Sequence, residues 1–112
     1  MSQRAWEMPL KNSWAGKCDN MASGGPEDII ESTVCNKAEA VGWLCRKVSW
    51  PGRRAAMDRL FVKEGRHVWI EFKAPGEDAE PLQSREHKRF RAAGAEVYVI
   101  DNVAAGLKVL GL

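Results

Sequence analysis

Apolar residues recur with a helical period in the segment that follows Gly24-Gly25. Four of them form an i, i+4, i+8, i+11 stripe: Ile30, Val34, Ala38 and Val41. This spacing places side chains on one face of a helix. Pro26 suits the first helical position, and Gly42 suits the C-terminal stop. The pattern therefore predicts a helix that begins at Pro26 and ends near Gly42.

Three segments typical of strands come next, and each is closed by turn-forming residues. They are Trp43–Ser49 before Pro51-Gly52, Asp58–Lys63 before Glu64-Gly65, and His67–Lys73 before Pro75-Gly76. Because the Glu64-Gly65-Arg66 link is short, the second and third segments should form a hairpin.

The C-terminal part of the chain continues with a helix, a strand and a helix. The first of these helices should run roughly from Pro81 to Ala93, ending before Gly94, with an apolar side made of Leu82, Phe90 and Ala93. Glu96–Ile100 is typical of a buried strand. Asn102 suits the cap of a short final helix that carries Val103, Leu107 and Leu110. The expected order is α-β-β-β-α-β-α, an α/β fold.

Length and composition fit one globular domain. The chain has 112 residues, of which 45% are hydrophobic and 29% charged. No apolar run approaches the roughly 18 residues of a membrane helix, and the N-terminus does not resemble a signal peptide. Residues 1–25 lack a clear period, so we expect an N-terminal arm or tail there and a folded domain at 26–112.

Cysteine usage indicates a reducing compartment. The three cysteines, Cys18, Cys35 and Cys45, are odd in number and show no C-x-x-C spacing. This argues against a disulfide framework and against a zinc site. Reduced thiols in a cytoplasm are the simplest interpretation, with Cys35 and Cys45 as core residues.

Basic residues are clustered although the net charge is only +2. One group lies at 46–59 and a second at 85–91: Arg46, Lys47, Arg53, Arg54 and Arg59, then Arg85, Lys88, Arg89 and Arg91. Clustered bases in a balanced chain favour a local anionic partner such as a nucleic acid. The alternative is two solvated faces.

The third strand segment carries the candidate chemistry. Strand side chains alternate between faces, so Val68, Ile70 and Phe72 share an apolar face. Glu71 and Lys73 lie on the other face, beside a hairpin partner that opens with Asp58. Taken alone, Glu71 and Lys73 are typical of a surface ion pair. Their mid-strand position, together with Asp58 and the surrounding bases, favours a functional site.

Two carboxylates in a low-dielectric setting raise the energy of the doubly ionised state, and a divalent cation removes that conflict. Asp58 and Glu71 can supply two oxygen ligands of the kind Mg²⁺ prefers, and the backbone carbonyl of Phe72 a third. Lys73 is then placed to position or deprotonate an attacking water, or to hold transition-state charge.

Other polar residues are weaker candidates. Glu27 shares the apolar side of the first helix, although an acid in a first turn also has an ordinary electrostatic explanation. Glu31 lies nearby, and we favour Glu27 over it. Gln83, at the start of the second helix, is placed to donate to a phosphate or to a metal-bound water, or is a plain N-terminal polar residue. His67 at a strand start, and His87 on the exposed side of a helix, do not form a site.

Four separated elements agree in order and spacing with one known family. They are the helix at Glu27–Gly42, the run Pro51–Phe61, the run Trp69–Gly76 followed by Gln83, and the strand at Gly94–Val99. They resemble the virus-type replication-repair nuclease (VRR-NUC) domain of the PD-(D/E)xK nuclease superfamily, in its stand-alone phage form. The family often has proline before the aspartate, where this chain has Met57, which leaves the pose of Asp58 open.

The resemblance implies a restriction-endonuclease-like α-β-β-β-α-β core, with a mixed sheet flanked by helices. It implies Mg²⁺- or Mn²⁺-dependent hydrolysis of DNA in the cytoplasm of a bacterial host. Carried across, Asp58 and Glu71 become metal ligands, Lys73 the catalytic lysine and Glu27 the helix-borne acid, and Gln83 is the glutamine after the E-x-K strand.

The phage members resemble Holliday-junction resolvases in organisation, which implies a homodimer acting on branched DNA. A C2 pair would supply the two centres that cutting both strands needs. Arg53, Arg54 and Arg59 would contact phosphates. The alternatives are a monomeric nicking or flap nuclease, and a DNA-binding module without catalysis.

Overall fold

The computed structural model describes residues 25–52 and 57–112. Within these ranges it contains three helices and four strands: α1 (Pro26–Ala40), β1 (Leu44–Lys47), β2 (Arg59–Lys63), β3 (Arg66–Phe72), α2 (Pro81–Ala92), β4 (Glu96–Ile100) and α3 (Val103–Val109). The predicted order is therefore confirmed, with ends that differ by up to two residues. The expected arm or tail at 1–25, except Gly25, lies outside the described residues.

The four strands form one mixed sheet in the order β1-β2-β3-β4. β1 pairs antiparallel with β2 and β2 antiparallel with β3, whereas β3 and β4 are parallel. The predicted hairpin joins β2 and β3 through Glu64 and Gly65, whose φ angles are 51° and 82°. Two consecutive positive φ angles are the conformation of a type I′ turn, which matches the twist of paired strands. The mixed α/β sheet implied by the resemblance is confirmed.

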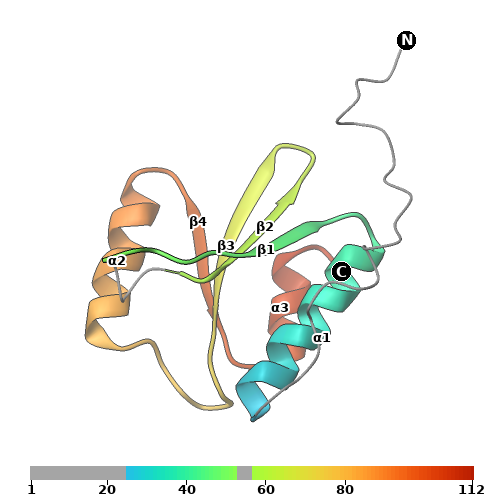
Figure 1. The fold of residues 1–112 in the computed structure, drawn as a ribbon, viewed down its shortest axis with the longest axis horizontal. Coiled ribbons are helices and arrows are strands. Elements are labelled where there is room, and N and C mark those ends of the chain that lie inside the picture. Colours follow the sequence, from blue (N-terminus) through green and yellow to red (C-terminus); the bar gives the residue numbers. More distant parts are fainter. Residues whose placement is uncertain (1–24, 53–56) are drawn as a thin grey trace.

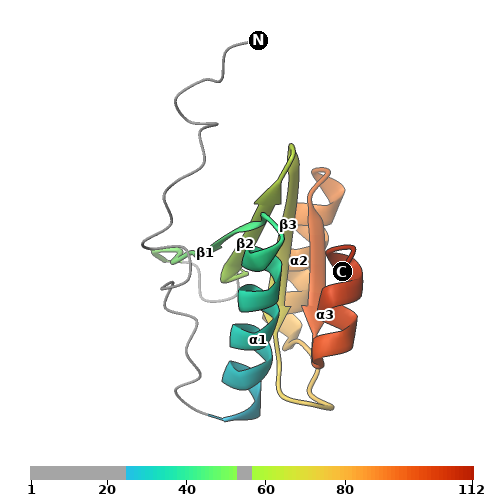
Figure 2. The same ribbon diagram turned by 90° about the vertical axis from the view of Figure 1, so that its right-hand side faces the viewer.

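The helices cover the sheet on both faces. α1 and α3 pack against each other and against one face, and α2 lies on the opposite face (Figure 1). The view turned by 90° shows α1 and α3 side by side with α2 behind the sheet (Figure 2). Gly106 of α3 permits the close approach of the two helices, because a Cβ there would lie 2.9 Å from Val34 Cγ2.

The main core lies between the sheet and the α1–α3 layer. Val34 and Ala38 of α1, and Val68 and Ile70 of β3, are fully buried there, as their predicted apolar faces require. Cys35 of α1 and Phe61 of β2 are fully buried in the same core. Cys45 of β1 is buried with them, so both predicted core cysteines lie in this layer. Val41, the last position of the predicted stripe, is exposed instead because the helix ends at Ala40.

The buried face of α2 differs from the predicted one. Leu82 and Ala93 are exposed, whereas His87 is 1% exposed. The helix is rotated so that His87 and Phe90 face the sheet, where Phe90 contacts the rings of Trp50 and Trp69. The expectation that His87 is on the exposed side was wrong, because aromatic packing sets the orientation of this charge-rich helix.

Across the described ranges, no helix is both long enough and apolar enough to span a membrane.

Candidate active site

Asp58 and Glu71 come from the two strands of the hairpin. Arg59 pairs with Ile70, so extending the register by one step sets Asp58 opposite Glu71. The main chain of Asp58 is still held at this step, because its carbonyl accepts a hydrogen bond of 2.8 Å from the Val48 amide. Glu71 is 6% exposed and Asp58 is half-buried. The structure therefore brings together the two carboxylates that the sequence analysis singled out.

Lys73 follows directly after β3. Its amide donates to the Ile100 carbonyl at 2.8 Å, which extends the parallel pairing with β4 by one residue. Because side chains alternate along a strand, Glu71 and Lys73 emerge on one face. Lys73 lowers the pKa of Glu71, but burial and the neighbouring Asp58 outweigh it and raise that pKa to about 7.

One oxygen of each carboxylate is left without a partner. Asp58 Oδ1 and Glu71 Oε1 are both buried, and neither has a hydrogen-bond partner among the described residues. Buried polar atoms are normally satisfied, so two unsatisfied anionic oxygens on facing residues need an explanation. Burial also raises the pKa of Asp58, with a further contribution from Glu31. Both observations describe an electrostatically unfavourable pair of facing carboxylates.

A divalent cation fits this donor set. In residues 25–52 and 57–112, no group of three or more His, Cys, Asp or Glu side chains gathers into a metal site. Mg²⁺, however, is commonly held by one or two carboxylates together with waters and substrate phosphates. The pair Asp58 and Glu71 matches that mode, with the Phe72 carbonyl as a further oxygen on the same strand.

The two acids considered on α1 have different surroundings. Glu31 is buried and forms an ion pair with Arg59 Nε. Glu27, in the first turn of α1, is half-buried, and burial raises its pKa. Lys73 opposes that rise and Asp58 adds to it, which brings Glu27 into the same electrostatic group. Glu31 is thus paired with Arg59, whereas Glu27 is linked to Asp58 and Lys73 through its electrostatics.

Arg59 does not lie where a phosphate contact requires. Its guanidinium is buried, with Nε bonded to Glu31 and Nη1 3.6 Å from Cys45 Sγ. Arg59 follows Asp58 directly, so strand alternation turns its side chain to the α1 face of the sheet. The expectation of a DNA contact is corrected for this residue. Arg53 and Arg54, the other two expected contacts, lie outside the described residues.

Gln83 has a local role in the structure. Its Oε1 accepts a hydrogen bond from the Glu80 amide at 3.0 Å, and the Glu80 side chain reaches the Gln83 backbone in return. This capping box satisfies two amides at the start of α2. The arrangement matches the plainer of the two interpretations of Gln83, a polar residue at a helix N-terminus.

Two features beside the acids escaped the sequence analysis. His87 is buried on the sheet side of α2, and its Nε2 has no hydrogen-bond partner in the described part of the chain. Burial lowers its pKa, with Arg91 and Lys73 acting in the same direction and Glu86 against it. The second feature is Trp50, which donates from Nε1 to the Met57 carbonyl at 2.6 Å. For His87, the sequence did contain a signal: it lies three residues before Phe90, a spacing that places both side chains on one face of a helix.

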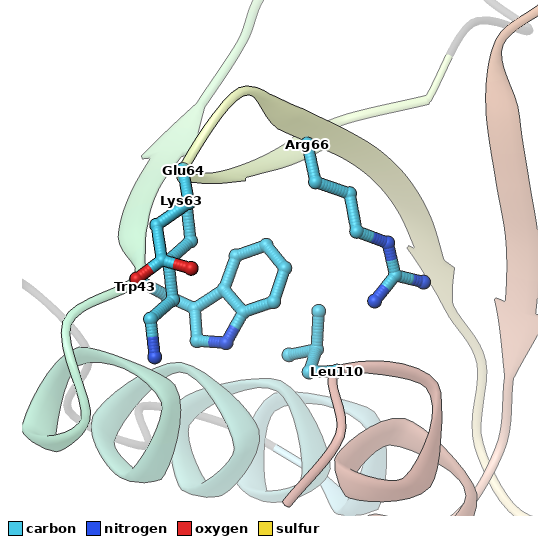
Figure 3. Close-up of a pocket in the computed structure, with 5 residues that line it drawn as sticks. All are labelled: Trp43, Lys63, Glu64, Arg66 and Leu110. Carbon is cyan, nitrogen blue, oxygen red and sulfur yellow. The ribbon is translucent and has the colours of Figure 1, made fainter.

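A separate cavity of about 270 Å³ lies at the turn end of the hairpin. Its lining is Trp43, Lys63, Glu64, Arg66 and Leu110 (Figure 3). Arg66 lies 5.8 Å from the centre of the Trp43 ring and is held by two 2.8 Å bonds to Glu96. Asp58 and Glu71 are at the other end of the same hairpin, so this cavity is not part of the candidate active site.

Comparisons with known proteins place the chain in a family. No protein-family profile matches it. It is 40% identical over 77 residues to the candidate nuclease p44 of Acyrthosiphon pisum secondary endosymbiont phage 1, a match that covers 68% of this chain and 83% of p44. A solved structure described as a VRR-NUC domain superposes with a TM-score of 0.72 at 32% identity, covering 79% of this chain and 97% of that one. The chain therefore belongs to the virus-type replication-repair nuclease (VRR-NUC) family, in its phage-type form.

Proposed function

We propose that this chain is a metal-dependent DNA endonuclease that hydrolyses phosphodiester bonds. Its family and the phage relative p44 support nuclease activity. The observation that carries the metal dependence is the pair of buried, unpartnered oxygens on Asp58 and Glu71. A catalytically silent DNA-binding module would have no reason to keep two facing acids in so unfavourable a state.

Asp58 and Glu71 would hold Mg²⁺ or Mn²⁺, with the Phe72 carbonyl as a third ligand and Glu27 as a further acid. When bound, the cation supplies activation of a water nucleophile and stabilisation of charge at phosphorus. Burial, and then repulsion from Asp58, raise the pKa of Glu71, and both effects favour binding of a proton or a cation at this pair.

Lys73 supplies the positive charge that the ligands lack. It lies on the same strand face as Glu71 and close enough to influence the pKa of both Glu71 and Glu27. An ammonium group there can donate hydrogen bonds to the attacking water and to the phosphate oxygens as negative charge develops. We assign to it the role of the catalytic lysine.

We propose branched DNA as the substrate and a homodimer as the active form. Each chain contributes one acid pair, so two cuts in a junction need two chains related by a C2 axis. Exposed bases on the described surface include Lys47 of β1 and Arg85, Lys88 and Arg89 of α2. With Arg53 and Arg54 they would contact phosphates, which gives affinity without sequence readout.

The experiment compares a four-way junction, a flap, a linear duplex and a supercoiled plasmid, each with Mg²⁺ or Mn²⁺ and with EDTA. Wild type should cut the junction in a cation-dependent way, and Lys73→Ala should cut at least about 100-fold more slowly. Lys108→Ala, an exposed lysine on α3, is the matched control and should cut like wild type.

The same experiment separates the alternatives. Cleavage that survives EDTA, or a Lys73→Ala variant as fast as wild type, would refute the mechanism. A wild type that binds all four substrates without cutting is a silent binding module. If light scattering shows a strict monomer, and the enzyme prefers flaps or nicks the plasmid, a monomeric nicking or flap nuclease replaces the proposed junction-cutting homodimer.

A further inference from the structure

Trp50 is bonded to the residue that precedes Asp58. Its indole N–H donates to the Met57 carbonyl at 2.6 Å, and the Met57 side chain is fully buried. Trp50 follows β1, and Met57 lies immediately before Asp58 and β2. The bond therefore reaches across seven positions of sequence to the main chain of the candidate metal ligand's neighbour.

The indole ring is held in place by two other elements. Its centroid lies 5.4 Å from that of Trp69 on β3 and 5.6 Å from that of Phe90 on α2. Trp69 and Phe90 are themselves 6.1 Å apart, so the three rings form one cluster. Trp69 shares its strand face with Glu71, two residues further on. The donor of the Trp50 bond is thus fixed relative to the strand that carries the second acid.

Separate hydrogen bonds hold Asp58 itself and the residue that follows it. Its own carbonyl accepts from the Val48 amide at 2.8 Å, and Arg59 is bonded to Glu31 on the opposite face of the sheet. Regular strand pairing begins only at Arg59, so it does not hold Met57. The bond from Trp50 supplies a restraint on that preceding residue.

We propose that Trp50 is a positioning residue for Asp58. Its N–H holds the Met57 carbonyl and thereby sets the direction in which the Asp58 carboxylate faces Glu71. No proline ring restrains φ at Met57, and the indole bond restrains this residue through its carbonyl instead. This inference rests on the proposed function, because it takes Asp58 as a metal ligand.

The distinguishing property is the N–H group rather than the aromatic ring. Trp50→Phe keeps an aromatic ring in the cluster and removes the donor. Trp69→Phe is the matched control, because it perturbs the same cluster and leaves the bond to Met57 intact. If Trp50→Phe is too unstable, incorporation of benzothienylalanine at position 50 keeps the ring shape and replaces only the N–H.

The readouts are Mn²⁺ binding by calorimetry, cleavage of a four-way junction as a function of Mg²⁺ concentration, DNA affinity in Ca²⁺, and melting temperature. Loss of a group that orients a metal ligand typically weakens metal affinity 10- to 100-fold. Trp50→Phe should therefore bind Mn²⁺ at least about tenfold more weakly, need correspondingly more Mg²⁺, and recover at high Mg²⁺. Its DNA affinity should stay within about twofold of wild type, and Trp69→Phe should retain wild-type metal affinity.

Two results would overturn the inference alone. One is a Trp50→Phe variant with wild-type Mn²⁺ affinity and Mg²⁺ dependence. The other is an equal loss in Trp50→Phe and Trp69→Phe that follows the fall in melting temperature, which would make the ring cluster a packing unit only. If wild type neither binds Mn²⁺ nor cuts, the proposed function itself fails and the inference falls with it.

Discussion

Breaking the ion pair between Arg59 and Glu31 should destabilise the protein strongly. The pair joins β2 to α1 beneath the helix, and both side chains are only 10% exposed. Burial alone would lower the pKa of Arg59, but the bond that Arg59 donates to Glu31, together with nearby negative charge, more than offsets this and keeps the guanidinium charged. Arg59→Met would leave the Glu31 carboxylate buried without its cation.

The magnitude follows from that burial. Ion pairs exposed to solvent contribute about 0–1 kcal/mol. Removing one partner of a buried pair is destabilising by about 3–5 kcal/mol, because the remaining charge stays desolvated. The second figure applies here and is a large share of the roughly 5–15 kcal/mol that holds a typical domain together. Arg59→Met combined with Glu31→Leu should recover most of the loss, since no charge is then left behind.

Urea unfolding followed by circular dichroism measures these differences. Arg66→Met is the control, because the Arg66–Glu96 pair is 40% and 36% exposed and should lose about 1 kcal/mol at most. DNA affinity measured in Ca²⁺ tests the competing idea that Arg59 contacts a phosphate. An Arg59→Met variant that keeps its stability, loses DNA affinity and shows a shallower salt dependence would refute our reasoning.

Three further predictions concern other parts of the fold. Burial lowers the pKa of His87, so the unfolded chain takes up a proton at a higher pH than the folded chain. Stability should therefore fall as the pH drops below about 6.5. His87→Leu should flatten that decline in urea titrations between pH 8 and 5. Gly106→Ala should lower stability by about 1–3 kcal/mol despite alanine's better helix propensity, because its Cβ would overlap Val34; a rise in melting temperature would show that α1 and α3 can move apart. Asp58→Asn should abolish cleavage and raise stability in EDTA by about 1 kcal/mol, because it removes a buried charge that repels Glu71. A less stable variant would mean that repulsion within the acid pair does not destabilise the fold.

Local rules were sufficient for the elements and for the acid pair. The short Glu64-Gly65-Arg66 link predicted the hairpin, and the structure forms it through Glu64 and Gly65. The hairpin and strand alternation then predicted that Asp58 lies beside Glu71, and the observed register sets the two residues opposite each other. These inferences depend on interactions between residues that are near in sequence or directly paired, which is why sequence alone supports them.

Long-range packing explains what was missed. The orientation of α2 depends on Phe90 meeting Trp50 and Trp69, and a helix so rich in charge has too weak an apolar period to reveal it. The bond from Trp50 to Met57 joins two residues outside any regular element and has no periodic signal. The position of Arg59, by contrast, follows from the sequence, because strand alternation from Asp58 places its side chain on the α1 face. The expected DNA contact rested on its place in a basic cluster instead.

Three consecutive residues explain how an unfavourable carboxylate persists at Asp58. A half-buried acid with an unpartnered oxygen would ordinarily turn toward water or toward a donor. Here the residue before it is tied to Trp50 and the residue after it to Glu31, on opposite faces of the sheet. Both ties are formed within the fold and involve neither Asp58 Oδ1 nor Glu71 Oε1. The stability of the flanking contacts therefore maintains an electrostatic cost at the centre, and a bound cation would relieve it.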